Sequence, residues 1–139
     1  MNIHTLCPYL RIPGQCEEAF NFYAHVLNGT IKDKHYFKQS PMQDQVDSRA
    51  NWQDKLLHIE MKCQGFTLMG SDGFPEQKGQ PSDNITLVVS VEQPQEAINI
   101  FQSFSAKGDV IMPIQKTFWA QQYGIVQDHF GITWNINCH

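Results

Sequence analysis

The sequence predicts an α+β fold built from two tandem copies of one βαβββ module. The first observation is a helical segment that occurs twice, because Glu18–Tyr23 (EAFNFY) returns as Glu96–Phe101 (EAINIF), 78 positions later. The second is the strand pattern before each helical segment, which matches at an offset of 79, and the third is the last strand of each half, which matches at an offset of 66. Such long offsets indicate two large copies rather than a short-period solenoid.

The composition is that of a folded chain of ordinary domain size. The 139 residues are 41% hydrophobic and 17% charged, and no apolar run reaches the ~18 residues of a membrane span. The net charge is −4 and the basic residues are scattered, which argues against a nucleic-acid partner. Residues 1–8 lack the pattern of a secretory signal, so we expect a cytoplasmic protein. The four cysteines are widely spaced and are expected to be free thiols.

The first half has the pattern of a strand, a helix and three strands. Apolar residues alternate over 6–12, recur at helical spacing over 16–27 and stop at Asn28-Gly29, a pair that commonly closes a helix. Further strands are expected at 30–37, 56–63 and 65–69. The polar run 38–54 is too long for a tight turn, and Trp52 near its end can anchor the run or cover a pocket.

The second half repeats this order after a linker. Residues 72–83 are rich in Gly, Pro and polar side chains and separate a first module, 1–71, from a second, 84–139, within a single domain spanning 1–139. The elements expected in the second module are a strand at 85–91, a helix from Pro94 to before Gly108, and strands at 109–114, 124–127 and 131–135. Trp134 shares a face with apolar residues of the last strand and is assigned to the core.

Nearly the whole chain carries motifs that occur together in one known group of proteins. They are Pro8-Tyr9-Leu10, the segment 16–23, His58-Ile59-Glu60, Thr67-Leu68-Met69 with Ser71-Asp72, Phe118-Trp119-Ala120 and the segment 128–137. In order and spacing they resemble the PhnB-like group of the vicinal oxygen chelate superfamily, which includes glyoxalase I, extradiol dioxygenases and the bleomycin and fosfomycin resistance proteins. The resemblance implies a curved, mostly antiparallel eight-stranded sheet that forms a cup with two main helices, often within a homodimer.

The resemblance also implies where a divalent metal would bind. Members of the superfamily commonly use two positions on first strands and two on last strands, and these fall at Cys7, Met69, Thr86 and Asn135. Only Cys7 is a plausible ligand, because a thioether, a hydroxyl and an amide coordinate such ions weakly. We therefore expect no metal cofactor and a protein that binds a small molecule. A metal-dependent lyase or dioxygenase is the competing class, and an interaction or structural role is the third.

The group carries an inherited name as a demethylubiquinone methyltransferase. Enzymes of that kind usually hold S-adenosylmethionine in a glycine-rich turn between a strand and a helix. The corresponding turns in this chain are Pro13-Gly14-Gln15 and Glu92-Gln93-Pro94, and neither has that pattern. We find no sequence support for methyl transfer.

Six side chains are the candidates for contact with a ligand. If residues 57, 59 and 61 pack beneath a helix, His58 and Glu60 face the expected cup, where titratable groups are costly unless they bond something. The alternative for this pair is a structural role. The aromatic residues at 118–123 can wall an apolar pocket, or belong to the core or a dimer contact. The candidates are Tyr9, His58, Glu60, Trp119, Tyr123 and Asn135, and His35 on the second expected strand is a further position of interest.

Overall fold

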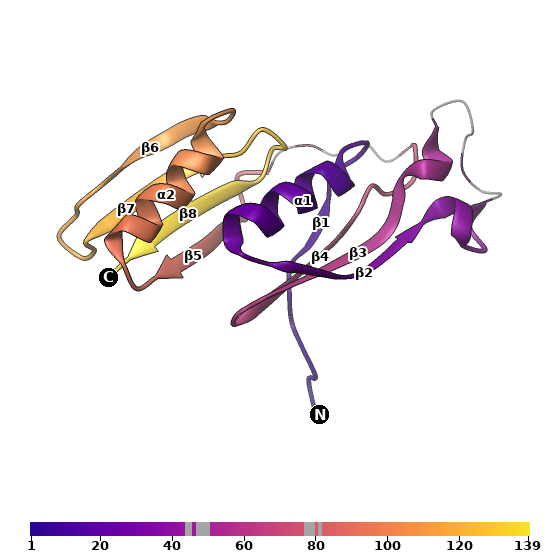
Figure 1. Ribbon diagram of the computed structural model, residues 1–139, viewed down its shortest axis with the longest axis horizontal. Helices are drawn as coiled ribbons and strands as arrows, with labels where there is room; N and C mark the ends of the chain where they lie inside the picture. The colour runs from indigo at the N-terminus through magenta and orange to yellow at the C-terminus, as the bar shows by residue number, and fades with distance from the viewer. Residues whose placement is uncertain (44–45, 47–50, 77–79, 81) are drawn as a thin grey trace. The chain divides into compact units, whose positions relative to one another are not determined.

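The chain folds into two compact units, each with one helix and one sheet. The computed structural model describes residues 1–43, 46, 51–76, 80 and 82–139. Unit 1 is Met1–Gly79 and unit 2 is Gln80–His139. Figure 1 shows the helix and the four strands of each unit. No helix among the described residues is long and apolar enough to cross a membrane.

The order of elements in each unit is strand, helix and three strands. Unit 1 contains β1 (Tyr9–Arg11), α1 (Cys16–Leu27), β2 (Thr30–Tyr36), β3 (Leu56–Cys63) and β4 (Phe66–Ser71), with the short 3-10 helices η1 (Phe37–Gln39) and η4 (Trp52–Asp54) between β2 and β3. Unit 2 contains β5 (Leu87–Val91), α2 (Pro94–Ser105), β6 (Asp109–Gln115), β7 (Gln122–Gln127) and β8 (Thr133–Cys138).

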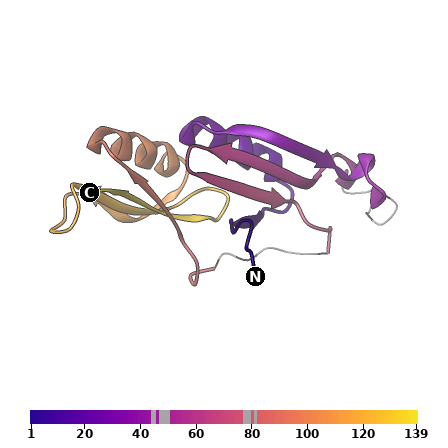
Figure 2. The same ribbon diagram turned by 90° about the horizontal axis from the view of Figure 1, so that it is seen from below.

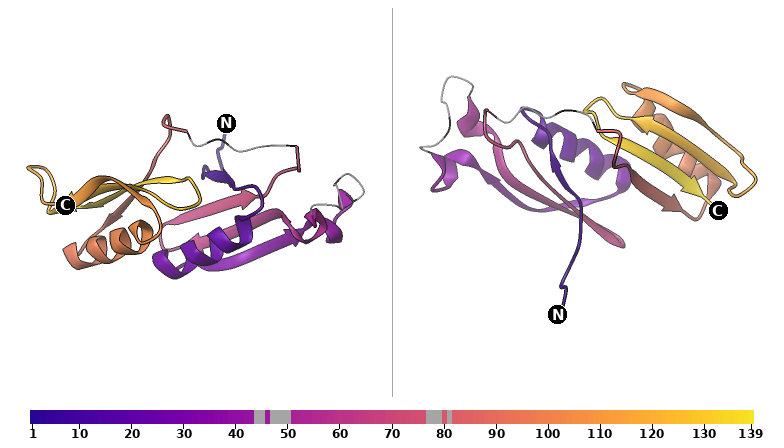
Figure 3. Two further views of the ribbon diagram at one scale, coloured as in Figure 1. Left: turned by 90° about the horizontal axis from the view of Figure 1, so that it is seen from above. Right: turned by 180° about the vertical axis from the view of Figure 1, so that it is seen from behind.

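The strand orders are β1-β4-β3-β2 in unit 1 and β5-β8-β7-β6 in unit 2. In each sheet the first and last strands pair in parallel, and the remaining pairs are antiparallel. The predicted α+β fold of two βαβββ modules is therefore confirmed, with the eight strands divided into two mostly antiparallel sheets of four. Each helix lies against one face of its own sheet (Figures 2 and 3).

The strand registers reproduce the duplication seen in the sequence. Tyr9 of β1 pairs with Met69 of β4, and Val88 of β5 pairs with Asn135 of β8. The first members of these pairs are 79 positions apart and the second members are 66 apart, which are the two offsets of the sequence repeat. The matching registers therefore show that the two units repeat each other in structure as well as in sequence.

In unit 1, α1 covers the face of the sheet that carries Ile59. The helix buries Phe20 completely, and a Cβ added to Gly70 of β4 would lie 2.6 Å from a ring carbon of Phe20. Gly70 pairs with Ile59 of β3, so the two residues share the helix-covered face. Because side chains alternate along a strand, His58 and Glu60 lie on the opposite face. Asn28, with φ of 56°, ends α1 in the left-handed conformation, at the predicted position.

In unit 2, Trp134 joins β8 to α2. Its side chain is 1% exposed and its ring stacks on that of Phe104 at a centroid distance of 4.7 Å. The assignment of Trp134 to the core is confirmed. Glycine at position 124 allows the close approach of α2, since an added Cβ would lie 2.8 Å from a ring carbon of Phe101.

Several strand ends differ from their predicted positions. β1 starts at Tyr9 rather than residue 6, because Pro8 can offer β4 only its carbonyl, which accepts from the Met69 N–H at 3.1 Å, and Leu6 is 93% exposed. β5 starts at residue 87 rather than 85. β8 starts at Thr133 rather than 131, because residues 128–132 form a turn closed by the Asp128 N–H bond to the Ile132 carbonyl.

The polar run 38–54 is described only in part, and residues 44–45 and 47–50 lie outside the described residues. Trp52 is 9% exposed, and its indole Nε1 donates to the carbonyl of Gly73 at 2.8 Å. The ring therefore anchors the end of the run to the segment that follows β4. All four cysteines are free, as expected.

Candidate functional site

The face of the unit 1 sheet opposite α1 brings together side chains from all four strands, and those from β1, β2 and β3 are polar. We call it the open face of unit 1, and define it by Tyr9, Asp33, His35, His58, Glu60 and Met69. The register aligns Tyr9, Met69, Glu60 and Asp33 across β1, β4, β3 and β2 in one row. His35 and His58 form the adjacent pair. Three of the six predicted candidates, Tyr9, His58 and Glu60, lie on this face.

Tyr9 and His58 are in direct contact. The Tyr9 hydroxyl oxygen is 3.0 Å from His58 Nδ1, and their ring centroids are 5.7 Å apart. Burial raises the pKa of the Tyr9 hydroxyl above its ordinary 10.0, so it is protonated at neutral pH. It can therefore donate to Nδ1 of a neutral imidazole, which places the ring proton on Nε2.

A second pair of polar side chains, His35 and Asp33, flanks this contact. His35 stacks beside His58 with a centroid distance of 6.5 Å, and its Nε2 lies 2.9 Å from a carboxylate oxygen of Asp33. Asp33 stands opposite Glu60 in the register, and two carboxylates placed in this way repel each other. The pairing of Asp33 with His35 offsets part of that repulsion. Sequence analysis missed Asp33, because its place depends on the register of β2 against β3.

The other three candidates form a group in unit 2. Asn135 Nδ2 donates to the Tyr123 hydroxyl at 2.8 Å, and the Tyr123 ring meets the Trp119 ring edge to face at 5.4 Å. Phe118, which is 97% exposed, contacts Trp119 at a centroid distance of 4.7 Å. Trp134 faces α2, so its neighbour Asn135 lies on the opposite face of the sheet. The structure thus brings the six predicted residues together as two groups of three.

The four superfamily metal positions, Cys7, Met69, Thr86 and Asn135, carry side chains that are poorly suited to a divalent ion. The amide nitrogen of Asn135 is already bonded to Tyr123, and Met69 offers only a thioether. Over the described part of the chain, no group of three or more His, Cys, Asp or Glu side chains is arranged to hold a metal ion.

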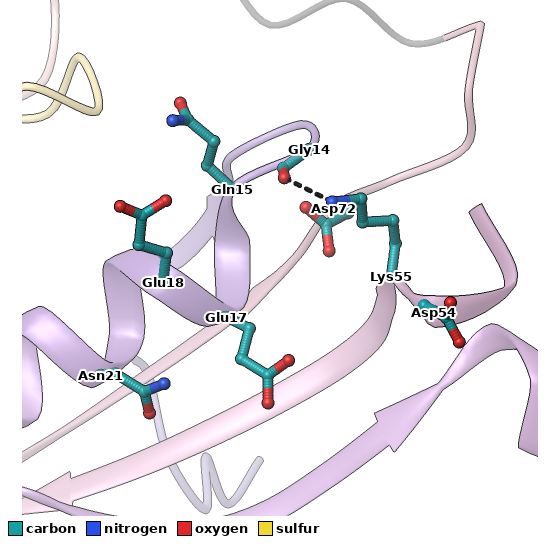
Figure 4. A pocket seen from close by; sticks show the side chains of 8 residues that line it. All are labelled: Gly14, Gln15, Glu17, Glu18, Asn21, Asp54, Lys55 and Asp72. Atoms are coloured by element: carbon teal, nitrogen blue, oxygen red, sulfur yellow. Dashed lines mark hydrogen bonds between the residues drawn. The ribbon is translucent and has the colours of Figure 1, made fainter. Parts of the chain in front are cut away.

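A cavity of about 410 Å³ at the start of α1 was not foreseen from the sequence. Figure 4 shows its lining, which is Gly14, Gln15, Glu17, Glu18, Asn21, Asp54, Lys55 and Asp72. Lys55 Nζ donates to the Gly14 carbonyl at 2.8 Å, and Glu17 accepts from Lys34 Nζ at 2.8 Å and from the Tyr36 hydroxyl at 2.6 Å.

These internal partners explain the charge state of the cavity wall. Burial raises the pKa of Glu17, but the hydrogen bonds from Lys34 and Tyr36 outweigh it, so the pKa lies below its usual value. Asp72 is 1% exposed and accepts the backbone N–H groups of Cys16 and Leu56. The strongest acceptors around the cavity are used within unit 1, and we assign this region a structural role.

Known proteins match this chain over nearly its whole length. The family model described as 3-demethylubiquinone-9 3-methyltransferase matches residues 4–137. Protein YjdN of Escherichia coli (strain K12) is 33% identical over 139 residues, which cover 95% of this chain and 93% of YjdN. The crystal structure of protein PA1353 from Pseudomonas aeruginosa is also 33% identical, with a TM-score of 0.87 over 99% of this chain and 98% of that chain.

More distant structures share the fold. The PhnB protein from Bacillus cereus is 18% identical with a TM-score of 0.83 over 98% of this chain and 100% of that chain. The fosfomycin resistance protein FosX from Listeria monocytogenes is 8% identical with a TM-score of 0.67, covering 99% of this chain and 94% of FosX. The fold is that of the vicinal oxygen chelate superfamily. The chain itself belongs to the family whose model is described as 3-demethylubiquinone-9 3-methyltransferase, and it shares its fold with the PhnB protein.

That description names a chemistry for which this chain lacks the usual binding turn. The turn before α1 contains one glycine, Gly14, and the turn before α2 contains none. The first backbone N–H of α1, at Cys16, already donates to the carboxylate of Asp72 at 3.0 Å. An internal acceptor therefore takes the first of the N–H groups that a cofactor's anionic group would use at this helix start.

Proposed function

We propose that the protein binds a small polar molecule on the open face of unit 1, without a metal ion. The observation that carries this proposal is the hydrogen bond between Tyr9 and His58, which fixes the imidazole beside Glu60. Nδ1 of His58 is bonded to Tyr9, and Nε2 makes no hydrogen bond to a described residue. A ring held at one nitrogen and left without a described partner at the other is preorganised to bond a ligand.

The neighbouring carboxylate supplies the second contact. Glu60 follows His58 by two positions on β3, so both side chains leave the same face about 7 Å apart along the strand. One molecule of a few heavy atoms can span that distance. Hydrogen-bond donors of this molecule can bond the carboxylate of Glu60, and its acceptors can bond the Nε2–H of a neutral His58.

Substitution of His58 tests this proposal. After a ligand is found by thermal-shift screening of polar metabolites, His58→Ala is expected to weaken its binding about tenfold, because a neutral hydrogen bond and the held ring are both lost. Tyr9→Phe should give a smaller loss, since the imidazole remains but is no longer fixed. Isothermal titration calorimetry measures both affinities. His25→Ala is the matched control, because His25 is exposed on α1. Unchanged affinity in folded His58→Ala and Glu60→Ala proteins would show that the ligand binds elsewhere.

A metal-dependent lyase or dioxygenase is the second candidate. Two histidines and two carboxylates, at positions 35, 58, 33 and 60, share the open face of unit 1 and are residue types that bind divalent ions, although no three of them are placed to hold one ion in this structure. Elemental analysis of gently purified protein separates the two candidates. Stoichiometric zinc, nickel, iron or manganese would favour the enzyme. Recovery of a protein partner with no pocket ligand would favour an interaction role.

We also propose that the protein functions as a homodimer. Each four-stranded sheet has two edge strands, β1 and β2 in unit 1 and β5 and β6 in unit 2. Unpaired strand edges are commonly covered by a second chain. Light scattering at micromolar concentration is expected to give twice the mass of the 16.0 kDa chain. A monomer mass at that concentration would contradict the proposal.

A further inference from the structure

Side chains of opposite character lie in two neighbouring rows on the open face of unit 1. The first row crosses the sheet at Asp33 and Glu60, which stand opposite each other on β2 and β3. The next row along the strands contains His58 on β3, and on β1 it contains Arg11, two positions after Tyr9 on the same face. We call them the acidic row and the basic row, and they lie about 7 Å apart along the strands.

The duplicated sheet of unit 2 shows that the fold does not need these charges. Its strand registers identify the positions equivalent to the two rows. They are Val88, Asn135, Ile125 and Met112 in one row and Ser90, Asn137, Tyr123 and Gln115 in the other. None of these residues is charged, and even Asn135, whose Oδ1 has no hydrogen-bond partner among the described residues, is a neutral amide. The charges of unit 1 therefore serve a purpose other than forming the sheet.

Each row contains one charged group that is not used within the chain. Arg11 is exposed and Glu60 is half-buried, and neither enters an ion pair in the part of the chain that the structure describes. Glu60 also faces Asp33, and like charges placed directly opposite on paired strands repel each other. A cation bound at Glu60 would offset this repulsion. An anion bound at the basic row would use the donors of Arg11 and His58.

We propose that the ligand of the open face of unit 1 is a zwitterion, with a primary ammonium group and an acid group a few bonds apart. The ammonium group bonds Glu60, and the acid group bonds the Nε2–H of His58 and the guanidinium of Arg11. Rows about 7 Å apart suit two charges separated by about four bonds. This inference rests on the proposed function and specifies the charge and length of a ligand described there only as small and polar.

Three probes of matched size test the charge requirement. 4-Aminobutanoate carries both groups, whereas butanoate carries only the acid group and butylamine only the ammonium group. We expect 4-aminobutanoate to bind at least about tenfold more tightly than either of the others, because it alone makes charge-assisted hydrogen bonds to both rows. Titration of the ¹⁵N-labelled full chain, followed by NMR, measures the three affinities. The largest shifts should come from the backbone signals of β1 and β3.

Substitutions in the two rows should have different effects on the probes. Glu60→Gln keeps the shape of the side chain but removes its charge, so 4-aminobutanoate should weaken at least about tenfold while butanoate binds as before. The melting temperature should stay the same or rise, because the repulsion with Asp33 is removed. Arg11→Gln should weaken 4-aminobutanoate and butanoate at least about fivefold and leave butylamine unchanged. Glu96→Gln and Lys107→Gln, at exposed positions of unit 2, are the matched controls and should change no affinity.

Equal affinity of the wild-type chain for the three probes, or no binding of 4-aminobutanoate, would overturn the inference. Unchanged affinity for 4-aminobutanoate in folded Glu60→Gln and Arg11→Gln proteins would do the same. A large fall in the melting temperature of Glu60→Gln would make Glu60 a structural group and overturn its assigned role. In all these cases the proposed function stands if His58→Ala weakens the ligand found by screening. If that ligand binds His58→Ala and Glu60→Ala as tightly as wild type, the proposed function fails as well.

Discussion

Trp134→Ala is expected to lower the free energy of unfolding by about 3–5 kcal/mol, the range for large aromatic residues removed from a packed core. The Trp134 side chain is 1% exposed, and its ring stacks on Phe104 with an interplanar angle of 14°. Phe104 is itself completely buried in α2, so the cavity left by the indole lies between helix and sheet. Urea denaturation followed by circular dichroism measures the loss.

The indole N–H contributes separately from the ring. Trp134 Nε1 donates to Asp128 Oδ2 at 2.9 Å, while Oδ1 of the same carboxylate accepts the backbone N–H groups of residues 130 and 132. Trp134→Phe keeps most of the stacking but removes this donor, and should cost about 1–3 kcal/mol. Trp119→Phe, at a half-exposed position, is the control and should change stability by no more than about 0.5 kcal/mol. Equal unfolding midpoints for wild type and Trp134→Ala would show that the core of unit 2 is held elsewhere.

The helices and the central strand could be predicted because their signals are local. The apolar stripe and the Asn28-Gly29 pair that follows it predicted the observed ends of α1, Cys16 and Leu27. β3 has the predicted bounds, Leu56–Cys63, and its burial follows the predicted alternation at Ile59 and Met61, whereas at its start Leu56 is buried in place of Leu57. The repeat then carried these assignments from one half to the other. Local patterns of this kind need no knowledge of the partner strand.

The ends of β1 and β5 were predicted wrongly because alternation measures side-chain polarity and not hydrogen bonding. Leu6 and Ile85 continue the alternating pattern, yet they are 93% and 73% exposed. Whether a residue belongs to a strand depends on a neighbouring backbone that offers N–H and C=O groups. The backbone bonds of β4 reach from the carbonyl of Pro8, which accepts from the Met69 N–H, to the N–H of Ile12, and Leu6 lies before them. That information is not contained in the segment itself.

The candidate site shows the same division. The sequence was sufficient to predict which face of the sheet carries His58 and Glu60, because that face follows from the alternation along β3. The contact of His58 with Tyr9 joins residues 49 positions apart, and the place of Asp33 depends on a register shift next to Ile31. The unsatisfied oxygen of Asn135 is also a property of its surroundings. These features appear only when the strands are placed side by side.

Asp72→Ala is the second change with a large expected effect, and we expect it to destabilise unit 1 by about 3–5 kcal/mol. Asp72 directly follows β4, and its two carboxylate oxygens accept from the Cys16 N–H at 3.0 Å and the Leu56 N–H at 2.7 Å. The side chain thereby joins the start of α1 and the start of β3 to the end of β4. Removing it leaves two backbone donors without their acceptor. Urea denaturation measures the loss, and Asp54→Ala, at an exposed position, is the matched control.

The pH dependence of stability provides an independent test of Asp72. Burial raises the pKa of this carboxyl above its ordinary 3.8, and the hydrogen bonds from Cys16 and Leu56 and the charge of Lys55 only partly oppose the rise. The folded state then binds the proton more tightly than the unfolded state. The stabilisation from protonated Asp72 is therefore complete below pH 3.8 and is lost as pH rises through the folded-state pKa. In that window the stability of wild type should decline with pH relative to Asp72→Asn, in which position 72 cannot titrate. Parallel curves of unfolding free energy against pH would show that the pKa of Asp72 is the same in the folded and unfolded states, and that its two backbone bonds balance the cost of burial.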